Sequence, residues 1–85
     1  MTLRLRPDVS TADTEYGTVL LDGADGRYWQ LNRTASLALR ALLEEETADQ
    51  AAQRLMAAYD VDGARAREDV ERLLAKLLDA KLVLR

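Results

Sequence analysis

The chain has 85 residues and a formal net charge of −3, and it contains neither cysteine nor histidine. This length predicts a single domain over residues 1–85. The absence of cysteine excludes disulfides and thiolate metal sites, and the absence of histidine removes the commonest general base and the usual nitrogen ligand of zinc. We therefore expect a protein that is not an enzyme and that has no catalytic residues, no metal and no cofactor.

The first part of the chain has the patterns of β-strands. Residues 3–6 alternate leucine and arginine, as in a strand with one solvated face, and Pro7 ends this strand. Residues 8–15 are polar without a period, which predicts a loop. Residues 16–21 are aromatic, β-branched and apolar, and they predict a second strand. The next five residues hold two glycines and two aspartates and predict a hairpin turn, from which residues 27–31 return as the third strand.

The second part of the chain predicts three helices. Asn32 suits a helix N-cap, and the apolar spacing after it predicts a first helix that ends at three consecutive glutamates. Thr47 and Gln50 fit a capping box at the start of a second helix. A third helix is expected over residues 64–80, and residues 82–84 predict an extended tail or a further strand.

This order of elements indicates the fold class. Short connections keep neighbouring strands adjacent, so the three predicted strands are expected to form one antiparallel sheet. The brief turn between the second and third helices is typical of a helix-turn-helix. The sequence therefore predicts an α+β, winged helix-turn-helix-like fold, with a three-stranded antiparallel sheet followed by three helices.

Two of these elements have features of a binding surface. In the strand 27–31, the period of two puts Trp29 and Leu31 on one face and Tyr28 and Gln30 on the other, so one aromatic side chain must lie on the outer face. The apolar stripe of the third helix spans about 140°, against the roughly 100° that covering a core requires. The stripe comprises Ala66, Val70, Leu73, Leu74, Leu77 and Leu78. Its residues are either all core, or partly core and partly a second contact surface.

The residues from Tyr28 to Asn32, the alanine- and leucine-rich helix that begins at Thr34, and the capped second helix resemble the PqqD-like family. The stretch Gly-Arg-Tyr-Trp-Gln-Leu-Asn is most similar to the free-standing recognition element of lasso-peptide biosynthesis. This resemblance implies a non-catalytic protein that binds the leader segment of a ribosomal precursor peptide. In the family, the leader becomes an extra strand beside the third strand and the third helix. The protein then presents it to a leader peptidase and an ATP-dependent cyclase.

Applied to this sequence, the resemblance implies a peptide-binding site on one strand and one helix. The strand contributes its backbone edge, the helix an apolar wall, and Arg67 a polar clamp. The implied peptide-binding residues are Arg27, Tyr28, Trp29, Gln30, Leu31, Arg67, Val70, Leu73, Leu74 and Leu77. The sequence does not determine which edge of the helix faces the peptide.

Two other functions could use the same elements. A winged-helix DNA-binding protein would place Arg65, Arg67 and Arg72 near the DNA phosphates. Acidic neighbours such as Glu68 and Asp69 would repel those phosphates. A homo-oligomeric structural subunit would pair the strand edge and the helix with a second copy, and the sequence leaves this alternative open. No apolar run approaches the roughly 20 residues that cross a bilayer, and the chain has no secretory start, so we expect a cytoplasmic protein without a membrane partner. The acidic net charge and the scattering of basic residues among acids predict no nucleic-acid partner.

Overall fold

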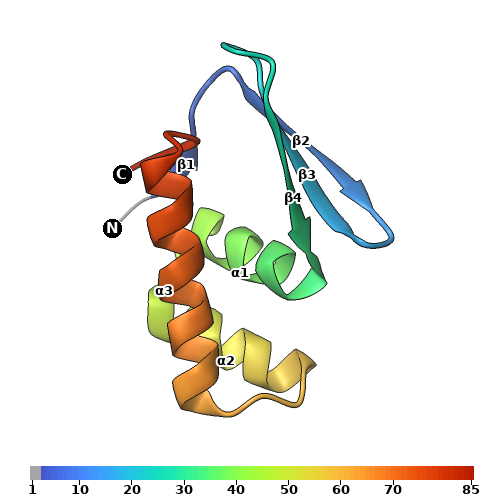
Figure 1. Ribbon diagram of the computed structural model, residues 1–85. Helices are drawn as coiled ribbons and strands as arrows, with labels where there is room; N and C mark the ends of the chain where they lie inside the picture. The colour runs from blue at the N-terminus through green and yellow to red at the C-terminus, as the bar shows by residue number, and fades with distance from the viewer. Residues whose placement is uncertain (1–2) are drawn as a thin grey trace.

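The computed structural model describes residues 3–85 and confirms an α+β fold with a three-stranded antiparallel sheet followed by three helices (Figure 1). Residues 1 and 2 of the predicted domain lie outside the described residues. The elements are β1 (Arg4–Leu5), β2 (Val9–Thr14), β3 (Gly17–Asp22), β4 (Tyr28–Asn32), α1 (Arg33–Leu43), α2 (Ala48–Ala58), α3 (Gly63–Asp79) and β5 (Val83–Leu84). Figure 1 shows α1 between the sheet and α3, while β2 and β3 project away from the helices as a hairpin.

The sheet has a different first strand from the one predicted. The predicted loop over residues 8–15 is wrong, because Val9–Thr14 forms β2 and pairs with β3 along its whole length. The predicted first strand exists as β1, but it pairs with β5 in a separate two-stranded ladder. In β2 only Val9 is buried, so this strand lacks the apolar alternation by which a strand is recognised in a sequence.

The helix caps are those that the sequence indicated, with one addition. The Asn32 side chain accepts a hydrogen bond from the Ala35 N–H at 2.9 Å, which caps α1. The capping box of α2 is complete, because Thr47 and Gln50 each accept the other's backbone N–H. The Asp62 side chain accepts the Arg65 N–H at 2.8 Å, so α3 begins one residue earlier than predicted, at Gly63.

The apolar stripe of α3 belongs mainly to the core. Five of its six residues, Ala66, Val70, Leu73, Leu74 and Leu77, are buried, and Leu78 is partly buried against them. They pack with Leu20 of β3, Leu55 of α2 and the chain around β5. The stripe is therefore mainly core, and a binding surface on α3 would lie at its edge, where Leu73 borders a surface groove.

Candidate functional site

One edge of the sheet is open. Among the described strands β4 pairs with β3 alone, and the C-terminal tail pairs with β1 rather than with β4 (Figure 1). The Asp22 N–H donates to the Arg27 carbonyl at 2.8 Å, so these residues form a hydrogen-bonded pair of the hairpin. Hydrogen-bonded and non-hydrogen-bonded pairs alternate along an antiparallel ladder. The N–H and C=O groups of Tyr28 and Gln30 therefore point away from β3, toward the open side.

The side chains of β4 alternate as the sequence predicted. Trp29 and Leu31 are partly buried and pack against the core, whereas Tyr28 is 68% exposed on the other face. Tyr28 lies opposite Leu21 of β3, which is 45% exposed, so the outer face of the sheet carries two large apolar side chains. The open edge thus separates an outer apolar face from an inner face that is turned toward the helices.

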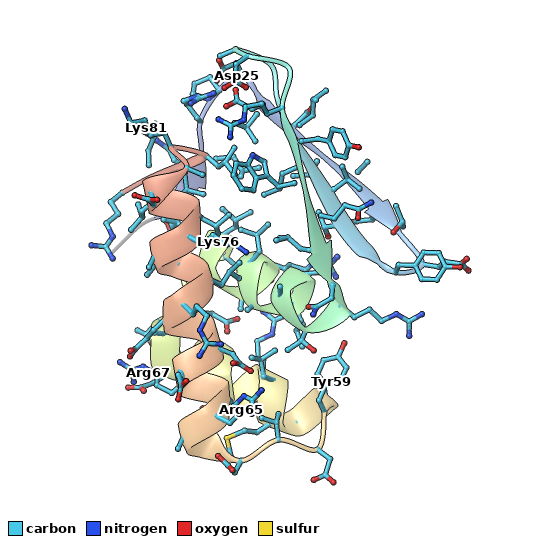
Figure 2. All side chains as sticks on the ribbon, in the orientation of Figure 1. Asp25, Tyr59, Arg65, Arg67, Lys76 and Lys81 are labelled. Carbon is cyan, nitrogen blue, oxygen red and sulfur yellow. The ribbon has the colours of Figure 1, made fainter. Side chains whose placement is uncertain are left out.

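A groove runs between the inner side of β4 and α3. One section of about 570 Å³ is bordered by the end of β4, the start of α1 and one edge of α3. A second section of about 550 Å³ lies between the β3–β4 turn and the C-terminal end of α3. Lys76 borders both sections, and Figure 2 shows it extending from α3 toward the sheet. We refer to the two sections together as the β4–α3 groove.

The first section has an apolar floor and a charged rim. The floor residues come from β4, α1, α2 and α3 and are Leu31, Ala35, Ala38, Leu55 and Leu73. The rim along α3 consists of Arg65, Asp69, Arg72 and Lys76. Such a combination suits an extended segment that buries apolar side chains on the floor and places polar side chains near the rim.

The second section is bordered by an aromatic side chain held beneath a cation. The Arg27 guanidinium lies over the Trp29 ring, 5.6 Å from its centroid. A guanidinium at this distance from an indole ring is attracted by the ring's negative face. The contact orients Trp29 at the end of the groove nearest the β3–β4 turn.

The predicted site residues occupy three different places. The structure places Arg27, Trp29, Gln30, Leu31 and Leu73 along the β4–α3 groove. Tyr28 contributes its backbone to the open edge, but its side chain lies on the outer face.

The remaining predicted residues lie outside the groove lining. Val70, Leu74 and Leu77 face the core, with side chains at most 9% exposed. Arg67 extends from the side of α3 away from the sheet, where it pairs with Asp49 of α2 and, at 2.6 Å, with Glu71 (Figure 2). This position separates Arg67 from the groove, so it is not placed to act as the polar clamp there.

Sequence reasoning missed the rim residues of α3 and the α1 floor. Asp69 and Lys76 flank the apolar stripe on the side opposite Arg67 and Glu71, and this is the edge that faces β4. The stripe alone cannot distinguish its two edges, because the packing of α3 against α1 and α2 decides which one is open.

Arg6 holds the β3–β4 end of the sheet to the end of α3. Its guanidinium donates to Asp8 at 2.6 Å, to the buried Asp22 carboxylate and to the Lys81 carbonyl at 2.7 Å. The hydrogen bond from Arg6 lowers the pKa of the Asp8 carboxyl below its ordinary 3.8. The contribution of the Asp8 carboxylate to stability is therefore present at neutral pH. It is lost as the pH falls from 3.8 through the lower pKa that Asp8 has in the folded protein. Arg6, Asp22 and Lys81 all border the second section of the groove.

Replacing Asp22 by alanine is expected to lower the free energy of unfolding by about 2 kcal/mol, because Arg6 and the Ala24 N–H both lose a buried acceptor. Urea denaturation followed by circular dichroism measures this change. Asp25→Ala is the matched control, since this exposed aspartate accepts a long 3.2 Å hydrogen bond from the Arg27 N–H and lies 4.0 Å from the Arg27 guanidinium. Equal effects of the two substitutions would contradict the role given to Asp22.

Comparisons with known proteins identify the family of the chain. The model of the family described as coenzyme PQQ synthesis protein D (PqqD) matches residues 17–83. The chain therefore belongs to the PqqD family. Within this family it is a RiPP recognition element, a PqqD-like domain of ribosomal peptide biosynthesis.

Two solved structures are similar to the chain over nearly its whole length. The first, "Lasso peptide synthetase B1 complexed with the leader peptide", is 41% identical, covers 100% of both chains and has a TM-score of 0.90. The second, "TbiB1 in Complex with the TbiA(beta) Leader Peptide", is 24% identical, covers 94% of this chain and 93% of the other, and has a TM-score of 0.82, which shows the shared fold. The comparison with curated proteins gives no match. In the described part of the chain, no helix is long and apolar enough to cross a membrane.

Proposed function

We propose that this protein is a non-catalytic binder of the leader segment of a ribosomal precursor peptide in lasso-peptide biosynthesis. The leader adds as a strand to the open edge of β4 and buries its inward-facing side chains in the β4–α3 groove. The protein then presents the bound leader to separate enzymes, a leader peptidase and a cyclase.

The observation that carries this proposal is an unpaired backbone edge directly beside a groove with an apolar floor. Residues 28 and 30 offer their N–H and C=O groups to the open side, and Leu31 and Leu73 border the groove next to them. Strand addition uses both features, since main-chain hydrogen bonds provide affinity and pockets for alternate side chains provide specificity. The similarity to lasso peptide synthetase B1 with its leader peptide supports this reading.

The expected affinity follows from these contacts. Four main-chain hydrogen bonds contribute about 1 kcal/mol each, and two or three apolar anchors contribute about 1.5–3 kcal/mol each. Association and ordering cost at least about 4 kcal/mol, which leaves at most roughly 9 kcal/mol. A dissociation constant in the micromolar to high-nanomolar range is therefore expected.

Titration of the fluorescein-labelled leader peptide of the 41% identical lasso peptide synthetase B1 tests the proposal by fluorescence polarisation. Saturable binding in this range, with little change between low and moderate salt, is expected for a mostly apolar strand-and-groove contact. A scrambled peptide of the same composition is the control. Absence of saturable binding of the leader peptide by the folded protein would contradict the proposal.

The two alternative functions give different results in related measurements. Binding to DNA would weaken steeply with salt. The arginines near the start of α3 are already paired with acidic side chains, Arg65 with Asp69 and Arg72 with Glu68, which weighs against this alternative. A homo-oligomer built through the β4 edge would be detected by light scattering in the absence of peptide. The proposed function does not require a second copy of the chain.

A further inference from the structure

The β4–α3 groove carries positive charge although the chain as a whole is acidic. The cations that border its two sections are Arg6, Arg27, Arg65, Arg72, Lys76 and Lys81, and the anions are Asp22, Asp25, Asp69 and Asp79. The groove lining is thus positive by two charges, whereas the formal net charge of the chain is −3. Asp8 and Glu68 lie outside this lining and pair with Arg6 and Arg72, which offsets these two charges, so the charge offered to a ligand depends on which cations are unpaired.

Most of the arginines in the groove already have carboxylate partners. Asp69 lies 3.4 Å from Arg65 and 3.3 Å from Arg72, and Arg72 also pairs with Glu68 at 2.6 Å. Arg6 is held by two aspartates, and Arg27 lies over an indole ring. Their charges are therefore largely used within the protein itself.

Lys76 is different from these arginines. Its side chain is exposed, and within residues 3–85 its ammonium group makes no ion pair or hydrogen bond. It extends from α3 toward the sheet (Figure 2) and is the cation shared by both sections of the groove. An uncommitted ammonium group at the middle of a groove is available to a carboxylate of whatever chain occupies it.

We propose that Lys76 is a specificity-determining residue, which selects leader peptides carrying an aspartate or glutamate at an inward-facing position. This inference rests on the proposed function and names the class of leader that the site takes. Side chains of a strand added to β4 alternate between the two faces of the sheet, so those on the side of Trp29 and Leu31 enter the groove. The acidic residue must consequently lie an even number of residues from the apolar residue that fills the floor near Leu31 and Leu73.

Selection from a phage-displayed library of random 15-residue peptides tests this inference without knowledge of the natural leader. The bait proteins are the wild type, Lys76→Glu and, as a matched control, Arg85→Glu. Arg85 does not border the groove, and its substitution changes the net charge by the same amount. Circular dichroism confirms that each bait is folded.

The wild type and Arg85→Glu are expected to enrich the same peptides, with an apolar residue and an acidic residue at an even spacing. Lys76→Glu is expected to lose the acidic preference and to gain lysine or arginine at that position. With the selected wild-type peptide, replacing its acidic residue by the amide, or Lys76 by glutamate, should weaken binding about threefold to tenfold in fluorescence polarisation. A lysine in the peptide should restore binding to Lys76→Glu.

Two negative results are distinguishable. Enriched peptides that bind the groove but show no acidic preference, or show the same preference with Lys76→Glu, would overturn the role of Lys76 and leave strand addition intact. A failure of all folded baits to enrich any peptide would count against the proposed function itself, and this inference would fall with it.

Discussion

Replacing Gln30 by proline is expected to weaken leader binding at least about tenfold while the protein remains folded. The Gln30 N–H points to the open side of β4, so proline removes a donor that a bound strand would use, which costs about 1 kcal/mol. The proline ring also occupies the space where the added strand must approach. Proline is tolerated in an edge strand when its nitrogen faces away from the ladder, so the pairing with β3 is expected to survive.

Fluorescence polarisation with the labelled leader peptide of the 41% identical relative measures this loss, and circular dichroism verifies folding. Gln30→Ala is the matched control, because it shortens the side chain but keeps the N–H, and it should bind within about threefold of the wild type. Trp29→Pro is a second control with the opposite expectation for folding. The Trp29 backbone nitrogen faces β3, so proline at this position should disrupt the sheet. Unchanged affinity of a folded Gln30→Pro variant would show that the leader does not add to β4.

Replacing Gly17 by alanine is expected to lower the free energy of unfolding by at least about 3 kcal/mol. Gly17 has a φ of +144°, and a Cβ atom there would lie 1.9 Å from the Leu31 carbonyl oxygen and 2.8 Å from the Asn32 carbonyl carbon. Relief of this overlap requires β3 to move away from β4, with loss of ladder hydrogen bonds. Because Leu31 borders the groove, binding should weaken together with stability.

Urea denaturation of Gly17→Ala measures the effect, and Gly26→Ala is its matched control. Gly26 also has a positive φ of +74°, but a Cβ atom there would meet nothing within 4 Å. Its substitution should therefore cost only the backbone term of about 1–2 kcal/mol. Equal losses at the two positions would mean that the close approach of Gly17 to β4 has no energetic importance.

The parts of the fold that depend on local chemistry could be predicted from the sequence. The Asn32 side chain caps α1 and the Thr47 side chain caps α2. Each accepts a hydrogen bond from a backbone N–H only three residues further along the chain, so the local sequence is enough to predict it. The alternation of Trp29 and Tyr28 across β4 follows directly from strand geometry. β2 could not be recognised, since its pairing with β3 is formed by backbone groups and only Val9 among its residues is buried.

The strand half of the candidate site was predictable, whereas of the predicted α3 residues only Leu73 borders the groove. The residues 27–31 border the open edge as expected, but the groove side of α3 is formed by the rim that includes Asp69 and Lys76. Arg67 and Lys76 both flank the apolar stripe, and the family resemblance implied Arg67 as the polar clamp. In the structure, the contact of Arg67 with Asp49 of α2 shows that its edge of α3 is turned away from β4.

The pairing of β1 with β5 has a practical consequence for anyone who attaches something to this protein. Arg4 lies opposite Leu84, so the two ends of the described chain leave the molecule side by side. Neither short strand contributes a residue to the lining of the β4–α3 groove. A fluorophore, a surface anchor or a fused enzyme can therefore be joined at this shared exit point and still leave the open edge of β4 accessible.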